Sequence, residues 1–217
     1  MKTDLQLQRD VMDELEFEPS VDAADIGVAV TDGVITLSGF VSSYAQKLAA
    51  EAAVRRVAGV RAIAEEIKVR LPSHSKTADH EIAGRIADLF AWDVTIPADK
   101  ITVKVEGGWV TLTGTVDWNF QGEMARRAAA RINGVLGVIN RIEIRQLPVG
   151  ADVKDRIMSA IKRAADADAS SITVQIDGRT ARLGGRVKGW YERQVAEHTA
   201  WAAPGVTKVE DNIVIAA

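Results

Sequence analysis

The 217-residue sequence contains no cysteine, and this absence excludes disulfide bonds, thiol catalysis and metal sites built on cysteine. It also lacks any apolar run that approaches the roughly 18 residues of a membrane-spanning helix. The first residues are rich in acidic side chains and hold no apolar segment of the kind that a signal peptide requires. We therefore expect a cytoplasmic protein, or a periplasmic one if a leader peptide has been removed.

The sequence has little net charge as well, and its formal value of −3 gives no strong field toward nucleic acid or an anionic membrane. The charges are nevertheless unevenly distributed. Residues 1–71 hold 8 basic and 12 acidic side chains, residues 72–147 hold 9 of each, and residues 148–217 hold 10 basic and 9 acidic ones. If any part of the chain binds an anion, the last third is electrostatically the least unfavourable.

Motifs for catalysis, nucleotide binding and nucleic-acid binding are absent too. The sequence contains no G-x-S-x-G nucleophile turn, no G-x-x-x-x-G-K phosphate loop and no H-E-x-x-H metal motif. It has neither a GXXG loop with basic flanks nor an RNP-type aromatic strand. Its three histidines, His74, His80 and His198, are scattered, and we interpret them as solvated surface residues although His74 and His80 have acidic neighbours. We predict a non-enzymatic protein with no cofactor, no metal and no nucleic-acid partner.

What the sequence does contain is one pattern written three times, in residues 26–70, 101–145 and 172–216. The three segments superpose without a gap. Two glycine columns mark the register in each copy: Gly39, Gly114 and Gly185, then Gly59, Gly134 and Gly205. Repetition of this kind indicates an architecture built from repeated units.

A helical pattern precedes each copy, with apolar residues four positions apart on one face. These residues are Leu7, Val11 and Leu15; Ile82, Ile86 and Phe90; and Val153, Ile157 and Ile161. Alternating apolar residues then predict two strands in each copy. The strands are joined by segments that suit two-residue hairpin turns, namely Asp32-Gly33, Gly107-Gly108 and Gly178-Arg179.

A second helix and a third strand complete each copy. Ser42 or Ser43 can cap this helix in the first copy and Asp117 in the second, whereas Lys188-Gly189 is a poorer cap in the third. The stripe that we predict to be buried is rich in alanine: Ala49, Ala53 and Val57; Met124, Ala128 and Ile132; Val195, Thr199 and Ala203. We thus predict an α+β fold of three tandem α-β-β-α-β repeats, each a three-stranded sheet covered on one face by two helices.

The predicted boundaries of the repeats are residues 1–71, 76–147 and 150–217. A unit of about 70 residues buries only a modest share of its surface, so it is marginally stable by itself. We therefore expect the three repeats to pack on one another or to form a homo-oligomer.

The residues of each copy resemble the BON domain, a family named for bacterial osmotically inducible and nodulation proteins. Its pattern I-x-V-x-V-x-[DG]-G-x-V-T-L-x-G-x-V, followed by G-V-x-x-V and a strand N-x-I-x-[VI], corresponds here to residues 26–41, 59–63 and 67–69. The second copy fits as well, and the third departs at Thr180–Leu183. The resemblance implies a non-catalytic domain that binds phospholipid membranes or small ligands, often in osmotic or envelope stress.

The loop between the second strand and the second helix reads GFVSSYAQ, GTVDWNFQ and GRVKGWYE in the three copies. Val41, Val116 and Val187 are predicted to point inward, so that their neighbours point outward. The outward aromatic residues are Phe40, Tyr44, Trp118, Phe120, Trp190 and Tyr191. They could enter a lipid interface or a subunit contact, but we interpret them first as staples that hold the helix start onto the sheet.

In the third copy Arg186 and Lys188 flank Val187 just before a helix N-terminus. Exposed cations beside free N–H groups form a candidate site for an anion or a lipid headgroup, whereas a merely solvated basic loop is the simpler interpretation. Asp117 in the equivalent place should repel anions from the second copy. The candidate residues for lipid or anion binding are Arg186, Lys188, Trp190, Tyr191, Trp118 and Phe120.

The predicted function is binding of an anionic phospholipid membrane or of a small ligand in an osmotic or envelope stress context. One alternative is a structural or interaction protein whose repeats mediate self-assembly or partner docking. Another is a sensor of an ion such as potassium, because the resemblance extends to a protein regarded as a potassium sensor.

Overall fold

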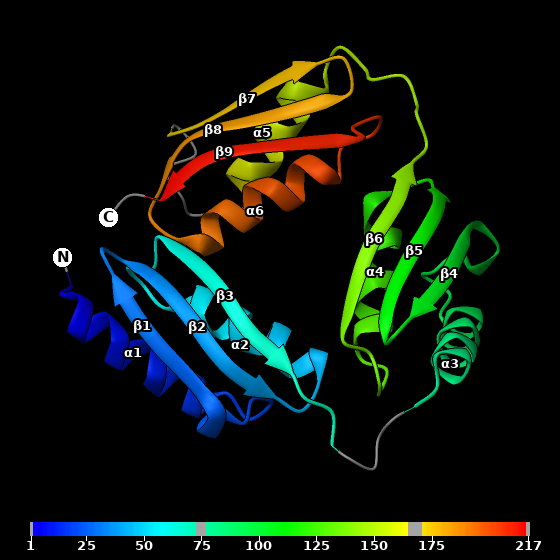
Figure 1. Cartoon of the computed structure of the whole chain (residues 1–217). Coiled ribbons are helices and arrows are strands. Elements are labelled where there is room, and N and C mark those ends of the chain that lie inside the picture. The colour runs from blue at the N-terminus through cyan, green and yellow to red at the C-terminus, as the bar shows by residue number, and fades with distance from the viewer. Residues whose placement is uncertain (1, 73–76, 165–170, 216–217) are drawn as a thin grey trace. The chain divides into compact units, whose positions relative to one another are not determined.

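The computed structural model describes residues 2–72, 77–164 and 171–215, which form three three-stranded sheets, each accompanied by two α-helices (Figure 1). This arrangement confirms the predicted α+β class and the α-β-β-α-β order of each repeat. The first repeat consists of α1 (Asp4–Phe17), the 3-10 helix η1 (Ala23–Asp25), β1 (Ile26–Thr31), β2 (Val34–Val41), α2 (Tyr44–Arg56) and β3 (Ala62–Val69).

The other two repeats have the same order of helices and strands. The second consists of α3 (Asp79–Trp92), the 3-10 helix η2 (Ala98–Lys100), β4 (Ile101–Glu106), β5 (Trp109–Val116), α4 (Asn119–Ala130) and β6 (Gly137–Ile144). The third consists of α5 (Val153–Ala164), β7 (Ile172–Asp177), β8 (Thr180–Val187), α6 (Trp190–Trp201) and β9 (Lys208–Ile215).

The second strand of each repeat lies in the middle of its sheet, in the orders β1-β2-β3, β4-β5-β6 and β7-β8-β9. In the first and third repeats, this strand pairs antiparallel with the strand before it and parallel with the strand after it. A hairpin can join the antiparallel pair, but the parallel pair needs a longer crossover. The second helix of each repeat supplies that crossover.

The first helix of each repeat packs through the stripe that its sequence predicts. Its apolar residues are at most 3% exposed: Leu7, Val11 and Leu15 in α1, Ile82, Ile86 and Phe90 in α3, and Val153, Ile157 and Ile161 in α5. Burial of one such side chain contributes about 1.5 to 3 kcal/mol. In the third repeat, this stripe joins buried residues of β7, β8, α6 and β9 in one core.

The stripe predicted for the second helix is wrong by one position. The fully buried helical residues are Ala50, Ala53 and Val54 in α2, Ala125 and Ala129 in α4, and Ala196 and Ala200 in α6. Of the nine predicted residues, Ala53 and Ala203 alone are buried. The prediction followed larger residues such as Met124 and Val195. A helix approaches its sheet most closely where the side chains are smallest, so the larger residues flank the contact instead.

The three hairpin turns form where the sequence places them, and positive φ angles at Asp32 (50°), Gly33 (75°), Gly107 (56°), Gly108 (79°) and Gly178 (58°) accompany them. In the second repeat, the carboxylate of Asp79 at the start of α3 accepts hydrogen bonds from the N–H groups of Gly107 (2.7 Å) and Gly108 (2.9 Å). Asp4 does the same for the first hairpin. This clamp fixes the first helix to the turn, and sequence reasoning missed it.

Candidate functional site

The loop between the second strand and the second helix contains two residues in each repeat: Ser42 and Ser43, Asp117 and Trp118, and Lys188 and Gly189. The valine before each loop is buried, with exposures of 5% for Val41, 1% for Val116 and 3% for Val187. This result confirms the predicted inward valines. Since side chains alternate along a strand, the residues on either side of each valine face away from the core.

In the third repeat the loop and the residues that flank it present two cations and one exposed aromatic ring. Arg186 and Lys188 are both exposed, and neither makes an ion pair or a side-chain hydrogen bond with any residue that the structure describes. Tyr191 is 70% exposed. Trp190 is half-buried instead, and the guanidinium of Arg193 lies 5.2 Å from its ring centroid. The loop therefore offers two solvated cations and one accessible ring, while Trp190 belongs to the packing of α6.

An acceptor side chain near the start of the helix holds the loop in the same way in all three repeats. The backbone N–H groups of Ser42, Asp117 and Lys188 donate to Gln46 (3.1 Å), Gln121 (3.1 Å) and Glu192 (2.6 Å) respectively. Sequence reasoning missed this contact, although a glutamine or glutamate in the same column of every copy was a usable signal. The contact gives the loop a fixed shape that does not depend on a ligand.

The helix caps explain part of the difference between the loops. Ser43 caps α2, because its hydroxyl accepts a hydrogen bond from the N–H of Gln46 at 3.2 Å. Gly189 occupies the N-cap of α6 and has no side chain for this purpose. Both observations agree with the predicted strong and poor caps, whereas Asp117 as a cap stays a prediction. The start of α6 consequently keeps backbone donors that no cap side chain satisfies.

The corresponding loop of the second repeat carries the opposite charge. The Asp117 carboxylate forms an ion pair with Arg145 at 3.1 Å. Trp118 and Phe120 are 37% and 50% exposed, which agrees with their predicted outward direction. An aromatic surface without an unpaired cation is less suited to an anion than the loop of the third repeat.

In the first repeat the aromatic residue before the loop lies against a guanidinium. The guanidinium of Arg70 lies 3.7 Å from the ring centroid of Phe40, and the ring is 37% exposed. Tyr44, the first residue of α2, is half-buried. The Phe40 ring thus has a partner in the residue after β3, and the interpretation that these aromatic residues secure the helix start against the sheet stays a prediction.

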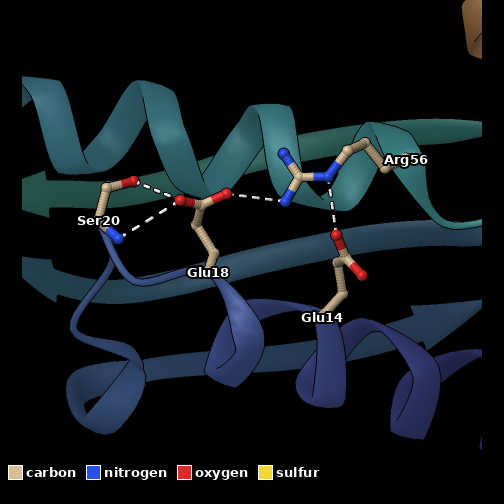
Figure 2. A network of polar contacts seen from close by, with 4 residues as sticks. All are labelled: Glu14, Glu18, Ser20 and Arg56. Carbon is tan, nitrogen blue, oxygen red and sulfur yellow. Dashed lines mark hydrogen bonds and ion pairs between the residues drawn. The ribbon is translucent and has the colours of Figure 1, made fainter.

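A second notable polar cluster joins the two helices of the first repeat (Figure 2). Arg56, the last residue of α2, donates to Glu14 at 2.7 Å and to Glu18 at 2.8 Å; Glu14 lies in the last turn of α1 and Glu18 is its C-cap. The Ser20 hydroxyl also donates to Glu18 at 2.7 Å. These contacts lower the pKa of Glu18, chiefly through Ser20 and then through Arg56, and the two carboxylates raise the pKa of Arg56.

The helices of the third repeat have a groove between them instead. It has a volume of about 680 Å³ and lies between α5 and α6. Its apolar lining comes from Val153, Ile157, Ala160, Ala202, Ala203 and Pro204. The polar residues that line it are Asp152, Asp155, Arg156, Ser159, Arg163, His198 and Thr199.

The described residues show neither a metal cluster nor a transmembrane helix. No group of three or more His, Asp or Glu side chains gathers there as metal ligands would. His74 lies outside the described residues, while His80 and His198 are exposed. In the same part of the chain no helix is both long enough and apolar enough to cross a bilayer.

Comparison with known families agrees with the repeat that the sequence and the fold display. The profile of the BON domain matches three times, at residues 3–70, 78–146 and 150–217. The chain belongs to the BON domain family. Each match holds one three-stranded BON sheet with its two helices.

Among curated proteins, the BON chain is similar to osmotically-inducible protein Y of Escherichia coli (strain K12). The two are 30% identical over 128 residues, which make up 57% of this chain and 64% of the relative. The match thus spans less than two thirds of the relative's length. A solved structure of CdsD, a structural protein of the type III secretion system of Chlamydia trachomatis, aligns over 96% of this chain and 91% of its own. The two chains are 14% identical in sequence, with a TM-score of 0.27.

Proposed function

We propose that this BON protein is a non-catalytic binding protein whose third repeat contacts anionic phospholipid headgroups through the loop between β8 and α6. The observation that supports this most is that Arg186 and Lys188 are exposed, lack ion-pair partners among the described residues, and lie within five residues of the 70% exposed Tyr191 in the sequence. Guanidinium and ammonium groups form charge-assisted hydrogen bonds with phosphate. Tyrosine rings favour the boundary between headgroups and acyl chains.

The expected interaction is weak and depends on salt. Each basic residue close to an anionic membrane contributes about 1 kcal/mol, so that Arg186 and Lys188 together contribute about 2 kcal/mol. The formal charge of −3 on the whole chain opposes approach to such a membrane. Added salt should therefore weaken the contact between the loop and the headgroups.

Sedimentation with vesicles tests the proposal. The full chain should sediment with phosphatidylglycerol vesicles and stay in the supernatant with phosphatidylcholine vesicles. The double variant Arg186→Glu with Lys188→Glu should lose most of this retention. A matched control is Arg85→Glu with Arg141→Glu, which changes the net charge equally at two exposed cations of the second repeat. Retention of the loop variant at the wild-type level would remove this loop from consideration.

The biological setting that we propose is osmotic stress. It is supported by membership of the BON family and by the similarity to a protein named as osmotically inducible. If the proposal is right, the abundance of this protein in its native host should rise after an osmotic upshift. An unchanged abundance, measured by quantitative proteomics, would contradict it.

A second candidate function is self-assembly or partner docking, and exposed apolar residues favour it. Phe17 at the end of α1 is 83% exposed and Trp92, in the same column at the end of α3, is 86% exposed. Large apolar side chains left in water are typical of contact surfaces. Light scattering across a range of protein concentrations tests this function. Assembly predicts a rising mass that Phe17→Ser with Trp92→Ser abolishes, and a constant mass would refute it.

A further inference from the structure

The groove between α5 and α6 lies where the first repeat has a polar bridge between its two helices. The columns of Glu14 and Arg56 hold Ala160 and Ala202 in the third copy, and both alanines line the groove. In the first repeat, Arg56 reaches from α2 to Glu14 on α1 (Figure 2). Two long side chains have thus been replaced by two methyl groups, and an open apolar surface results.

The lining of the groove is that of a small-molecule site. Ligand sites commonly measure about 300 to 1,000 Å³ and combine an apolar wall with a few polar groups. The groove, at about 680 Å³, has a floor of Val153 and Ile157, each at most 2% exposed. Its apolar walls include Ala160 and Ala202.

The charges on the rim favour an anion of low charge at one end. Asp155 and Arg163 are eight residues apart on α5, which corresponds to about 12 Å along the helix. Arg156 is near Asp152, at 4.0 Å, whereas Arg163 makes no ion pair with any described residue. One guanidinium without an ion-pair partner among the described residues matches one carboxylate, because its planar fork can donate two parallel hydrogen bonds. The carboxylates of Asp152 and Asp155 would repel a more highly charged headgroup.

From this geometry we infer that the groove binds a single-chain fatty acid. Its alkyl chain lies along the accessible Ala160, Ala202 and Pro204, and its carboxylate pairs with Arg163. We expect a ligand with a single alkyl chain, because the groove is open and only two helices bound it. This site differs from the proposed headgroup contact at Arg186 and Lys188, and it does not depend on that contact.

Isothermal titration of the full chain with sodium decanoate, kept below its micelle-forming concentration, tests the inference. The wild-type chain should bind decanoate with saturation. The variant Ala160→Glu with Ala202→Arg rebuilds the bridge of the first repeat and fills the groove, so it should bind at least about tenfold more weakly. Its circular dichroism should match that of the wild type, because the same pair is present in the folded first repeat.

A second variant keeps the test decisive even if the rebuilt bridge disturbs folding. Arg163→Gln removes the guanidinium from an exposed position and should weaken decanoate binding about tenfold or more. Decanol, which has no charge, should bind wild type and Arg163→Gln equally. The Arg186→Glu with Lys188→Glu variant should bind decanoate as the wild type does, so a failure of the membrane proposal would be seen separately. Absence of decanoate binding, or unchanged affinity in both groove variants, would overturn the inference.

Discussion

Three glycines of the second repeat should respond to alanine substitution in three different ways. Gly84 lies on the exposed side of α3 with no atom near the place that a Cβ would occupy. Gly107 lies in the hairpin turn at φ +56° and also has free space around it. Gly114 lies in β5 at φ +139°, and a Cβ there would overlap the backbone carbonyl oxygen of Lys100. Alanine substitutions at these three sites therefore test the effects of helix propensity, backbone strain and steric overlap one at a time.

The expected changes in the free energy of unfolding differ in sign as well as in size. Gly84→Ala should raise the free energy of unfolding by up to about 1 kcal/mol, because alanine favours a helix interior. Gly107→Ala should lower it by about 1 kcal/mol, since the left-handed conformation is costly for a residue with a Cβ. Gly114→Ala adds a steric clash to strain of this kind and should lower it by about 2 to 6 kcal/mol.

Urea unfolding followed by tryptophan fluorescence can measure this series. Two of the five tryptophans, Trp190 and Trp201, belong to the third repeat. Replacing both with phenylalanine leaves only reporters in the second repeat, and all three glycine variants are compared in that background. The reasoning would be refuted if Gly114→Ala cost no more than Gly107→Ala, because the close approach to Lys100 would then have no energetic effect.

Three further predictions concern packing and polar contacts. Ile86→Ala should destabilise the second repeat by about 2 to 5 kcal/mol in urea, since Ile86 is fully buried; a smaller loss would contradict its place in the core. Asp79→Ala removes the acceptor of two N–H groups and should cost about 1 kcal/mol in the same assay; an unchanged free energy of unfolding would contradict a stabilising role of the carboxylate. Because Ser20 and Arg56 lower the pKa of Glu18, its stabilising contribution is present above the unfolded-state pKa and is lost as the pH falls through the folded-state value. Hydrogen exchange in α1 should thus differ between wild type and Glu18→Gln at neutral pH and converge in acid; a constant difference would contradict this.

The hydrophobic spacing of the sequence predicted most of the fold because two simple periods determine it. Apolar residues four positions apart gave the buried stripes of α1, α3 and α5. Alternating apolar residues and short glycine turns gave the hairpins, and the turn at Gly107-Gly108 has the positive φ angles that such a connection requires. Threefold repetition strengthened each of these predictions, because an accidental pattern would not recur in register.

The same reasoning failed for the second helix of each repeat, where small alanines and not the larger apolar residues face the sheet. In α2 and its equivalents, alanine occupies both the buried face and its borders, so the apolar period did not identify the contact. Contacts between distant parts of the sequence were missed for another reason. The bond from Gly107 to Asp79 joins residues 28 positions apart, and only the fold brings them together. The column of Asp79 holds Asp4 in the first copy but Gly150 in the third, so even the repeat gave only a partial signal for this contact.

Candidate sites were harder to predict than the fold, because the repeats share a core and differ on their surfaces. The column of Phe17 holds Trp92 and then Arg163, and that of Glu14 holds Leu89 and then Ala160. None of these differences disturbs the three-stranded sheets, so the pattern that identifies the domain says nothing about what each copy binds. The structure shows which of these residues form ion pairs. The Glu14 carboxylate is held by Arg56, whereas Arg163 has no ion-pair partner in the described chain. A function assigned to the family as a whole should therefore be tested repeat by repeat, with the equivalent residues of the other copies as internal controls.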